Sequence, residues 1–331
     1  MSARVMVLIL AADHDRTVDR VAAELTGRGV PVTRVDTADF PIGLRLGASF
    51  SNGAGHWGGR LTGHTEGGRS VLVDLAEVTS VYYRHPTQFR LPEGMSGPER
   101  IFAYNEARRG FGGVLQALDC LWVNDPVRSA AAAYKPVQLA AAAAVGLRVP
   151  DTVIANDPEY IRSWAAGLGR PIIYKPVGGI WHPEAGEIRM IYTERVEDLG
   201  WLRDAGLDLT AHMFQEWVEK AHEARAVVIG GQVFTMAIHT DSPAGRVDWR
   251  SDYDANRYEP VELPAGVRNG LIRLHERLGL VFGACDLIRT PEGEWVFLET
   301  NVTGEWGWLE ANCGVPIAKT IADVLEAGRV K

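Results

Sequence analysis

The chain has 331 residues, 46% of them hydrophobic, and a formal net charge of −8; this length and composition predict a globular protein with two or three subdomains. It has no basic tract, so we expect no nucleic-acid partner. An odd number of cysteines without metal-type spacing argues against a disulfide framework, and no apolar stretch reaches the ~20 residues of a membrane helix. We therefore expect a cytoplasmic protein with no membrane partner.

The first part of the chain, which we place at residues 1–124, reads as an α/β domain. Residues 4–36 have a strand–helix–strand pattern whose helix ends at Gly29. Further elements are expected here: strands at residues 70–75, 78–84 and 121–124, and a helix at residues 98–118. Residues 53–58 match the dinucleotide fingerprint G-x-G-x-x-G, but strand-like sequence follows them, so we predict a hairpin or loop.

A second unit is expected at residues 125–213. Asp125 and Pro126 are typical of a helix start, and a helix break follows at Lys135. The remaining expected elements are strands at residues 149–155, 171–179 and 187–194, and helices at residues 157–169 and 196–206.

A third unit is expected at residues 214–331. Its expected elements are a strand at residues 213–220, a hairpin at 224–240 with a Gly-Gly turn, a helix at 267–280, a hairpin at 282–301 and a helix at 316–328.

Three oxygen-bearing side chains meet in the later hairpin. We expect its first strand to end at Asp286 and its second at Glu299, with Asn301 two residues further on. Side chains two apart on a strand point the same way, so the three could share one face. Carboxylate and amide oxygens suit Mg²⁺, whose remaining positions are often filled by substrate phosphates. The alternative is an exposed hairpin with polar ends.

Lys175 lies in an apolar strand directly before Gly178 and Gly179. An ammonium group there needs a partner, because burying an unpaired charge is costly. A nucleotide phosphate is a natural partner, since glycines let backbone N–H groups approach it. The alternative is a lysine that extends from an edge strand to solvent.

The stretch around residues 214–231 has the features of a nucleotide-binding edge. The carbonyl of Glu216 and the N–H of Val218 match the donor and acceptor edge of adenine. Glu223 and Arg225 lie two apart on one face, where one could bind a ribose hydroxyl and the other a phosphate. An ordinary half-buried strand and a cross-strand ion pair are the alternatives.

The order of these motifs resembles the ATP-grasp superfamily over residues 124–331, and residues 1–124 are similar to its usual N-terminal α/β domain. Three stretches resemble the graspetide maturases, which crosslink ribosomal precursor peptides through side-chain esters or amides: SVYYRHPTQF at residues 80–89, NDPVRSAAAAYKPVQLAAAAAVGLRVPDT at 124–152 and ETNVTGEWGWLE at 299–310. Val302 departs from the pattern, since Pro is common after the asparagine.

The resemblance implies an α/β fold of the α+β ATP-grasp type, in which two subdomains enclose ATP. It also implies residue roles. Lys135 and Lys175 would hold the α- and β-phosphates beside Gly178 and Gly179; Gln215, Glu216 and Val218 would frame adenine; Glu223 would bind the ribose; Arg225, with His239 nearby, would contact the γ-phosphate or acyl phosphate; and Asp286, Glu299 and Asn301 would ligate two Mg²⁺ ions, for which Mn²⁺ could substitute. Arg225, Lys175 and His239 are thus the candidate catalytic residues.

The implied function is that of an ATP-dependent macrocyclase. It would activate Asp or Glu side chains of a precursor peptide as acyl phosphates and join them to Ser or Thr hydroxyls or Lys amines. The peptide's leader would dock on residues 180–206, and the family implies a homodimer. The alternatives are a small-molecule ligase of the same fold, of the glutamate-adding or dipeptide-forming type, and a non-catalytic nucleotide-dependent binding protein.

Overall fold

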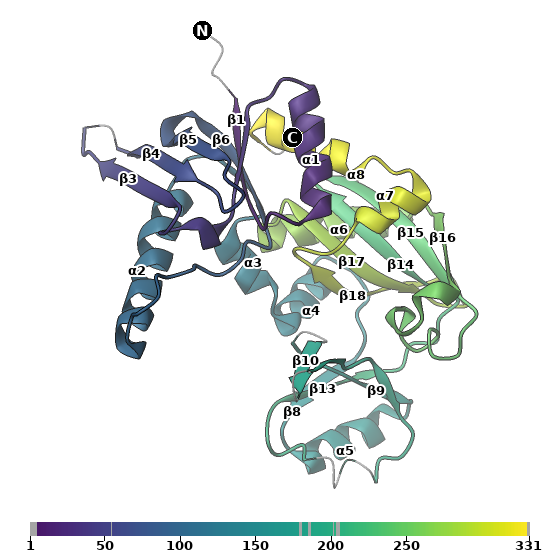
Figure 1. Ribbon diagram of the computed structural model, residues 1–331. Coiled ribbons are helices and arrows are strands. Elements are labelled where there is room, and N and C mark those ends of the chain that lie inside the picture. Colours follow the sequence, from purple (N-terminus) through teal and green to yellow (C-terminus); the bar gives the residue numbers. More distant parts are fainter. Residues whose placement is uncertain are drawn as a thin grey trace.

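The computed structural model describes residues 5–329 except residues 54, 179–180, 185–186, 201 and 203–205, and describes residues 181–184 and 187–190 by their backbone only. Within this part of the chain no helix is long and apolar enough to cross a membrane. The described elements form five sheets with helices between and around them (Figure 1). The mixture of α and β elements agrees with the expected fold class.

The N-terminal part is built on a four-stranded parallel sheet in the order β2-β1-β6-β7. Its strands are β1 (Met6–Ala11), β2 (Val32–Val35), β6 (Val78–Arg84) and β7 (Leu121–Val123), and its helices are α1 (Arg16–Gly27) and α2 (Gly97–Gln116). Every side chain of β1 is buried. Those on one face pack with α1 and those on the other with α2, so the strand is apolar throughout, as is typical of parallel sheets covered on both sides.

A small antiparallel sheet lies beside this parallel sheet. It consists of β3 (Leu44–Phe50), β4 (Trp57–His64) and β5 (Ser70–Asp74). The G-x-G-x-x-G motif falls at the turn between β3 and β4, and β4 begins at Trp57 inside the motif. The prediction of a hairpin in place of a dinucleotide site is confirmed.

The central part forms a lower lobe in Figure 1, with an antiparallel sheet in the order β12-β9-β13-β8. Its elements are β8 (Thr152–Ala155), α5 (Pro158–Leu168), β9 (Ile172–Lys175), β12 (Glu194–Val196) and β13 (His212–Glu216), and a separate hairpin is made by β10 (Trp181–Glu184) and β11 (Glu187–Met190). Side chains of α5, including Ile161 and Ala165, pack on Val153 and Phe214 of this sheet.

The C-terminal part is a five-stranded antiparallel sheet in the order β16-β15-β14-β17-β18. Its strands are β14 (His222–Ile229), β15 (Gln232–Thr240), β16 (Asn256–Pro260), β17 (Phe282–Arg289) and β18 (Trp295–Asn301). Gly230 and Gly231 both have positive φ, which the tight β14–β15 turn requires. One face of the sheet packs against α4 (Lys135–Ala144) and α6 (Ala265–Leu278), and the other against α8 (Ile317–Ala327).

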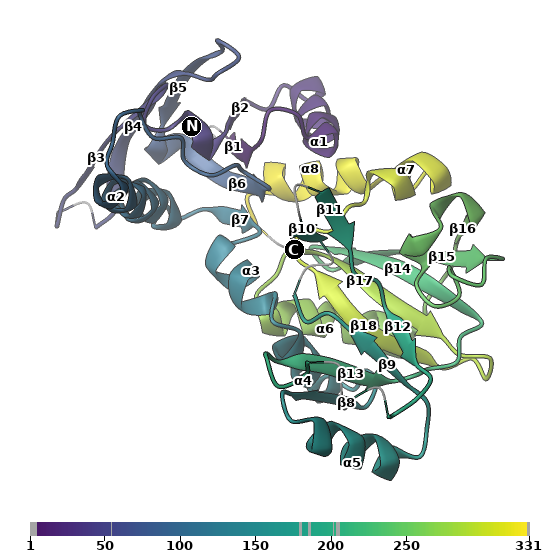
Figure 2. The same cartoon turned by 60° about the horizontal axis from the view of Figure 1, so that its bottom comes forward.

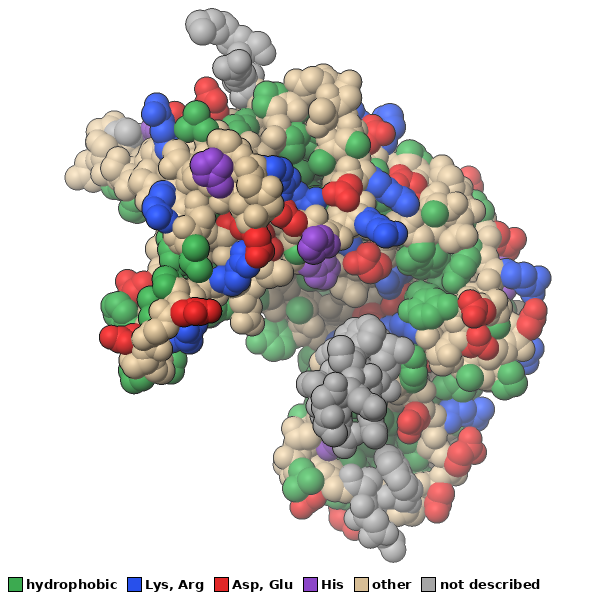
Figure 3. All heavy atoms as spheres, viewed as in Figure 1, with side chains coloured by type: hydrophobic (Ala, Val, Ile, Leu, Met, Phe, Trp, Pro, Cys, Tyr) green, Lys and Arg blue, Asp and Glu red, His purple; other side chains and the backbone are tan. Residues whose placement is uncertain are grey.

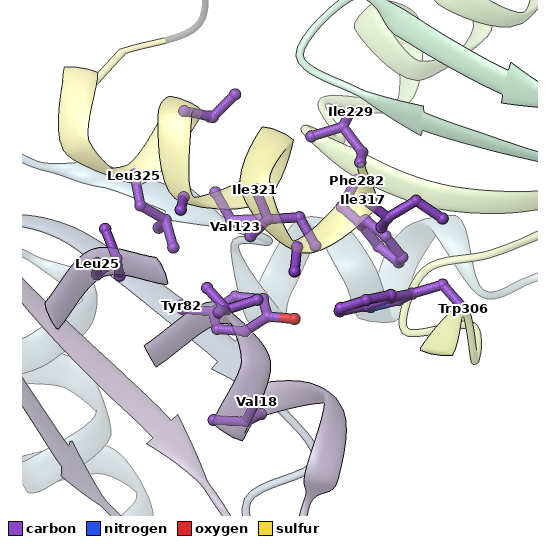
Figure 4. Close-up of a cluster of buried hydrophobic side chains, with 14 of the residues drawn as sticks. Val18, Leu25, Tyr82, Val123, Ile229, Phe282, Trp306, Ile317, Ile321 and Leu325 are labelled. Atoms are coloured by element: carbon purple, nitrogen blue, oxygen red, sulfur yellow. The ribbon is translucent and has the colours of Figure 1, made fainter. Parts of the chain in front are cut away.

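A single apolar core joins the N-terminal and C-terminal sheets. Val18 and Leu25 of α1 meet Ile321 and Leu325 of α8, and Tyr82 of β6 lies beside Trp306, which precedes α7 (Gly307–Cys313) (Figure 4). Trp306 and Leu325 are fully buried. Because this core contains residues from both ends of the chain, it holds the two sheets in a fixed relation.

Two expected elements differ from the structure. The strand expected at residues 187–194 is divided between β11 and β12. Of the helix expected at residues 196–206, residues 197–200 are coil and turn, and residues 201 and 203–205 lie outside the described residues. Asp198 Oδ1 accepts a hydrogen bond from the Gly200 N–H at 2.7 Å. Such a local side-chain hydrogen bond competes with the helix, and glycine weakens it further.

The view in Figure 3 shows how charge and shape are distributed over one face. Acidic and basic side chains are interspersed there, and the surface is hollowed between the part that contains α2 and the lower lobe.

Candidate active site

A cavity is lined by residues of β9 and β13 in the central sheet and of β17 and β18 in the C-terminal sheet. Figure 2 shows these strands near one another. Part of its lining is apolar and comes from both sides: Pro150, Ile173, Val218, Ile288 and Leu298. Its remaining lining is strongly charged and includes Lys175, Glu223, Arg250, Asp286 and Glu299. An apolar slot beside a charged end fits a planar base attached to phosphates.

Three charged residues form a row across neighbouring strands of the C-terminal sheet. Arg225 of β14 pairs with Asp286 of β17, which in turn pairs with Glu299 of β18. Directly paired residues on adjacent strands point to the same face, so Arg225 shares the face from which Asp286 and Glu299 line the cavity. Arg225 Nη1 donates to Asp286 Oδ1 at 2.6 Å, and both side chains are buried.

Glu299 is surrounded by cations. Lys135 Nζ donates to its Oε2, while Lys175 Nζ lies 3.4 Å and Arg250 Nη1 3.7 Å from its Oε1. Burial alone would raise the pKa of Glu299, but Lys175, Lys135 and Arg250 together hold this pKa far below its usual value. The carboxylate is therefore ionised, and it gathers the positive groups that a polyphosphate would need.

The two lysines reach Glu299 from different elements. Lys135 is the first residue of α4, and Lys175 is the last residue of β9. On α4, the buried Gln138 amide accepts from the Thr300 N–H and donates to the Thr300 carbonyl, both at 2.8 Å. This pair of hydrogen bonds fixes β18 against α4, so Glu299 and Lys135 are held together by the backbone next to them.

Asn301 ends β18 and is exposed, with its backbone paired to Ala284. Its Oδ1 accepts from the Thr303 N–H at 3.4 Å. The expectation that the two strands end at Asp286 and Glu299 is corrected, because β17 continues to Arg289 and β18 to Asn301. Asp286 pairs with Glu299, and Asn301 lies two residues beyond Glu299, so the three residues share one face of the hairpin, although Asn301 does not line the cavity. Their carboxylate and amide oxygens are of the kind that Mg²⁺ accepts.

The predicted adenine edge lies along the cavity. The Val218 N–H donates to no other described residue, while the Glu216 N–H donates to the Asp151 carbonyl at 2.9 Å. The Glu216 carboxylate is held by Arg170 Nη1 at 2.5 Å, and Gln215 donates to Thr152 Oγ1 at 3.0 Å. The side chains of Gln215 and Glu216 are therefore held by neighbouring residues, and residues 215–218 line the cavity.

Glu223 lies at the boundary of the cavity, where Lys220 Nζ donates to its Oε1 at 2.6 Å. Burial raises the pKa of Glu223, and the Lys220 ammonium group opposes that rise. Because Glu223 lines the cavity and only its Oε1 is bonded to Lys220, its carboxylate can accept a further hydrogen bond from a hydroxyl group.

Comparisons with known proteins agree with this geometry. The family model of the MvdD pre-ATP grasp domain matches residues 6–130. The chain is similar to macrocyclase MdnC from Microcystis aeruginosa MRC, solved with its precursor peptide MdnA (28% identity, 97% of this chain and 99% of that chain, TM-score 0.80). It is also similar to a RiPP-associated ATP-grasp ligase from Chryseobacterium gregarium, solved with ADP and a leader and core peptide (25% identity, 97% and 96%, TM-score 0.85). The chain is an ATP-dependent ligase with the ATP-grasp fold, and it resembles the graspetide maturases.

A third solved structure is ATP-grasp ligase PsnB with a phosphomimetic variant of its minimal precursor, Mg and ADP. This ligase and PsnB are 25% identical over 98% of each chain, with a TM-score of 0.73. No curated protein matches the sequence.

His239 is the predicted catalytic residue that the ligase does not bring to the cavity. In the β14–β15 pairing Arg225 lies opposite Met236 and Glu223 opposite Ile238, so His239 points to the other face of the sheet. There its Nε2 lies 2.9 Å from Glu259 Oε1, and its ring lies 4.9 Å from that of His222. The placement of His239 beside Arg225 was wrong.

The predicted glycine loop and leader surface are only partly described. Gly178 follows β9 in a bend, whereas Gly179 lies outside the described residues. Of residues 180–206, the β10–β11 hairpin is described by its backbone.

Sequence reasoning missed Asp248 and Arg250, which lie in the irregular segment between β15 and β16. Arg250 Nε and Nη2 donate to the two Asp248 oxygens at 2.9 and 3.0 Å, and both side chains line the cavity of the ligase. This bidentate pair raises the pKa of Arg250 despite its burial and keeps it charged. The only sequence signal was an Asp and an Arg two residues apart in a segment without periodicity.

Proposed function

We propose that this ligase is an ATP-dependent macrocyclase. It activates Asp or Glu side chains of a ribosomal precursor peptide as acyl phosphates and joins them to Ser or Thr hydroxyls or Lys amines. The observation that carries the proposal is the group of Lys135, Lys175 and Arg250 around Glu299, next to the Arg225–Asp286 pair. Similarity to ligases solved with precursor peptides supports a peptide substrate.

In this proposal the cavity binds ATP with adenine between the apolar residues. The Val218 N–H and Glu216 carbonyl bind the base beside Gln215, and Glu223 accepts a ribose hydroxyl. Lys135 and Lys175 contact the α- and β-phosphates, with backbone groups of Gly178 and Gly179 beside them. The two lysines can leave Glu299 for the phosphates because their side chains are long and unbranched.

Asp286, Glu299 and Asn301 would hold Mg²⁺ in this arrangement. Two ions are proposed, and Mn²⁺ should substitute because it accepts the same oxygen ligands. The bound metal neutralises charge on the phosphate oxygens during transfer. A PsnB structure containing Mg and ADP supports this part of the proposal.

The reaction has two steps. A peptide carboxylate oxygen attacks the γ-phosphorus, the bond to the bridging oxygen breaks, and ADP leaves. A hydroxyl or amine then attacks the carbonyl carbon, phosphate leaves with the nucleophile's proton, and an ester or amide remains. Arg225 and Lys175 stabilise the transferring phosphoryl group, and Arg250, whose Nη1 is not held by Asp248, is available for the peptide carboxylate.

The remaining partners follow from the same proposal. The precursor's leader docks on the region of residues 180–206, which includes the β10–β11 hairpin. A homodimer is proposed as well; Ile101 and Phe102 of α2 support it, because their side chains are 66% and 67% exposed and large apolar groups favour contact. We place the enzyme in the cytoplasm, where ATP and the precursor are made.

The test is ADP release together with the mass of the peptide. The enzyme with ATP and Mg²⁺ should release ADP when given a leader-bearing precursor encoded beside it, and the peptide should lose one water per crosslink. ADP release with free amino acids, accompanied by a mass gain, would favour a small-molecule ligase. ATP binding without turnover on either substrate would favour a binding protein.

A further inference from the structure

Arg84, at the end of β6, is a charged residue that is only 2% exposed. Its Nε donates to Asp15 Oδ2 at 3.1 Å and to Thr17 Oγ1 at 2.8 Å, both at the start of α1. Its two terminal nitrogens reach in the other direction, into the loop that follows β18. A buried guanidinium group needs every one of these acceptors, because an unpaired buried charge is costly.

The loop contacts of Arg84 are specific to residues 303–305. Nη1 lies 3.2 Å from the Thr303 carbonyl and 3.5 Å from the Gly304 carbonyl, and Nη2 lies 2.8 Å from Glu305 Oε1. This loop begins directly after Asn301, the outermost proposed metal ligand. Thr303 and Gly304 bond back to Asn301, through its side-chain and main-chain oxygens at 3.4 and 3.1 Å.

Two neighbours of Arg84 in the N-terminal part hold the same loop. His85 Nε2 lies 3.0 Å from the Thr303 carbonyl, and Asn124 Nδ2 donates to the Val302 carbonyl at 2.9 Å. Asn124 also bonds to both backbone groups of Phe282, at the start of β17, at 2.8 Å each. The backbone beyond both metal-ligand strands is therefore fixed from the N-terminal sheet.

Apolar packing next to Arg84 helps to hold these polar contacts in place. Tyr82, two residues before Arg84, and Trp306, directly after Glu305, lie side by side, with the Tyr82 hydroxyl directed toward the Trp306 ring (Figure 4). The relative position of β6 and the loop is thus set by packing on one side of Arg84 and by hydrogen bonds on the other.

We propose that Arg84 is a positioning residue for the metal site: it fixes the loop after Asn301, so that the N-terminal part of the chain determines how well Mg²⁺ binds. The inference rests on the proposed metal set of Asp286, Glu299 and Asn301. Arg84 itself touches neither nucleotide nor metal. It acts through the backbone that orients Asn301, as outer residues orient ligands in other metal sites.

The test compares ADP binding by the whole protein with and without Mg²⁺, using calorimetry in identical buffers. Arg84→Gln should leave metal-free ADP affinity unchanged and raise the Mg²⁺ concentration needed to strengthen ADP binding by about 10- to 100-fold, the usual effect of removing an outer partner of a metal ligand. Arg60→Gln is the matched control, because Arg60 lies in the same part of the chain with its side chain 69% exposed. An Arg84→Gln protein that melts at a lower temperature with an unchanged Mg²⁺ dependence would overturn the proposal.

A second variant decides the question if Arg84→Gln does not fold. Glu305 is 62% exposed, so Glu305→Ala removes one Arg84 contact without disturbing the core. A weaker Mg²⁺ response in Glu305→Ala supports the positioning role, and an unchanged response overturns it. Absence of ADP binding by the unmodified protein, with or without Mg²⁺, would instead contradict the proposed function.

Discussion

At the scale of single residues, the surroundings of Glu299 determine how the site responds to its ligands. One largely buried carboxylate has Lys135, Lys175 and Arg250 around it. Without a ligand, the carboxylate forms ion pairs with the cationic side chains that a nucleotide would need. When Mg²⁺ binds Glu299, the lysines are released and can bind phosphates. When phosphates bind the lysines, Glu299 is released and can bind Mg²⁺. Each ligand should therefore strengthen the binding of the other.

Glu299→Gln should reverse the usual effect of deleting a metal ligand. Without the carboxylate the cations are free, so ADP should bind more tightly in the absence of Mg²⁺, by about 1.5 kcal/mol, the lower end for hydrogen bonds to charged groups. Mg²⁺ should then add little, and turnover should be lost. Calorimetry of both proteins measures this, with Glu292→Gln in the exposed turn of the same hairpin as the control. Weaker metal-free binding in Glu299→Gln would show that the carboxylate does not hold the cations back.

At the scale of elements, the hydrogen bonds between α4 and β18 hold the two halves of the phosphate site together. Gln138→Met keeps the side-chain volume and removes the amide that bonds to Thr300 and Ala132. The buried backbone groups left unpaired should lower the free energy of unfolding by about 1–3 kcal/mol. Urea unfolding measures the change, and Gln232→Met on the exposed start of β15 should have little effect. Equal stability of the two variants would contradict this account of β18.

A buried histidine of α6, His275, should make the free energy of unfolding of the ligase depend on pH. His275 Nδ1 lies 2.8 Å from the Leu271 carbonyl and Nε2 lies 3.2 Å from Thr300 Oγ1, and burial lowers the pKa of His275 from 6.5 to about 4. Below pH ~6.5 the unfolded chain takes up a proton that the folded chain excludes, so this stability is complete above that pH and is lost as the pH falls toward 4.

The measurement is the unfolding free energy between pH 7 and pH 5, in about half-unit steps, for the wild-type protein and His275→Gln. The wild type should lose up to about 1.4 kcal/mol more per pH unit than the variant in the lower half of this range. Parallel curves would mean that His275 is protonated equally in the folded and unfolded chains.

The elements also explain which parts of the site could be predicted. Asp286 and Glu299 were found because a hairpin with a short turn and a period of two determines which side chains meet. The same rule, applied to the Gly230-Gly231 turn, excludes His239 from the active-site face. A two-residue turn places His239 opposite His222, whereas Arg225 points to the other face of the sheet. Arg250 could not be found this way, because the segment between β15 and β16 has no repeating pattern from which its direction follows.

At the scale of the whole molecule, the active site depends on contacts between parts that are distant in sequence. The cavity needs the central sheet to face the C-terminal sheet, and the metal-ligand strands are fixed at their ends by Asn124, His85 and Arg84. The order of elements was largely predictable, because each has its own periodicity. The contacts of Arg84 were not, because they join residues about 220 positions apart through backbone carbonyls that no side-chain pattern reveals.

The most direct test of the account is an isotope experiment on the peptide carboxylates. A precursor whose Asp and Glu side chains carry a heavy oxygen isotope is incubated with the enzyme, ATP and Mg²⁺, and the released phosphate and the peptide are analysed by mass spectrometry. The acyl phosphate route predicts that each crosslink transfers one labelled oxygen to inorganic phosphate, so the peptide's mass falls by that of one water containing this labelled oxygen. Unlabelled phosphate released alongside a crosslinked peptide, or label found in AMP, would contradict the proposed reaction.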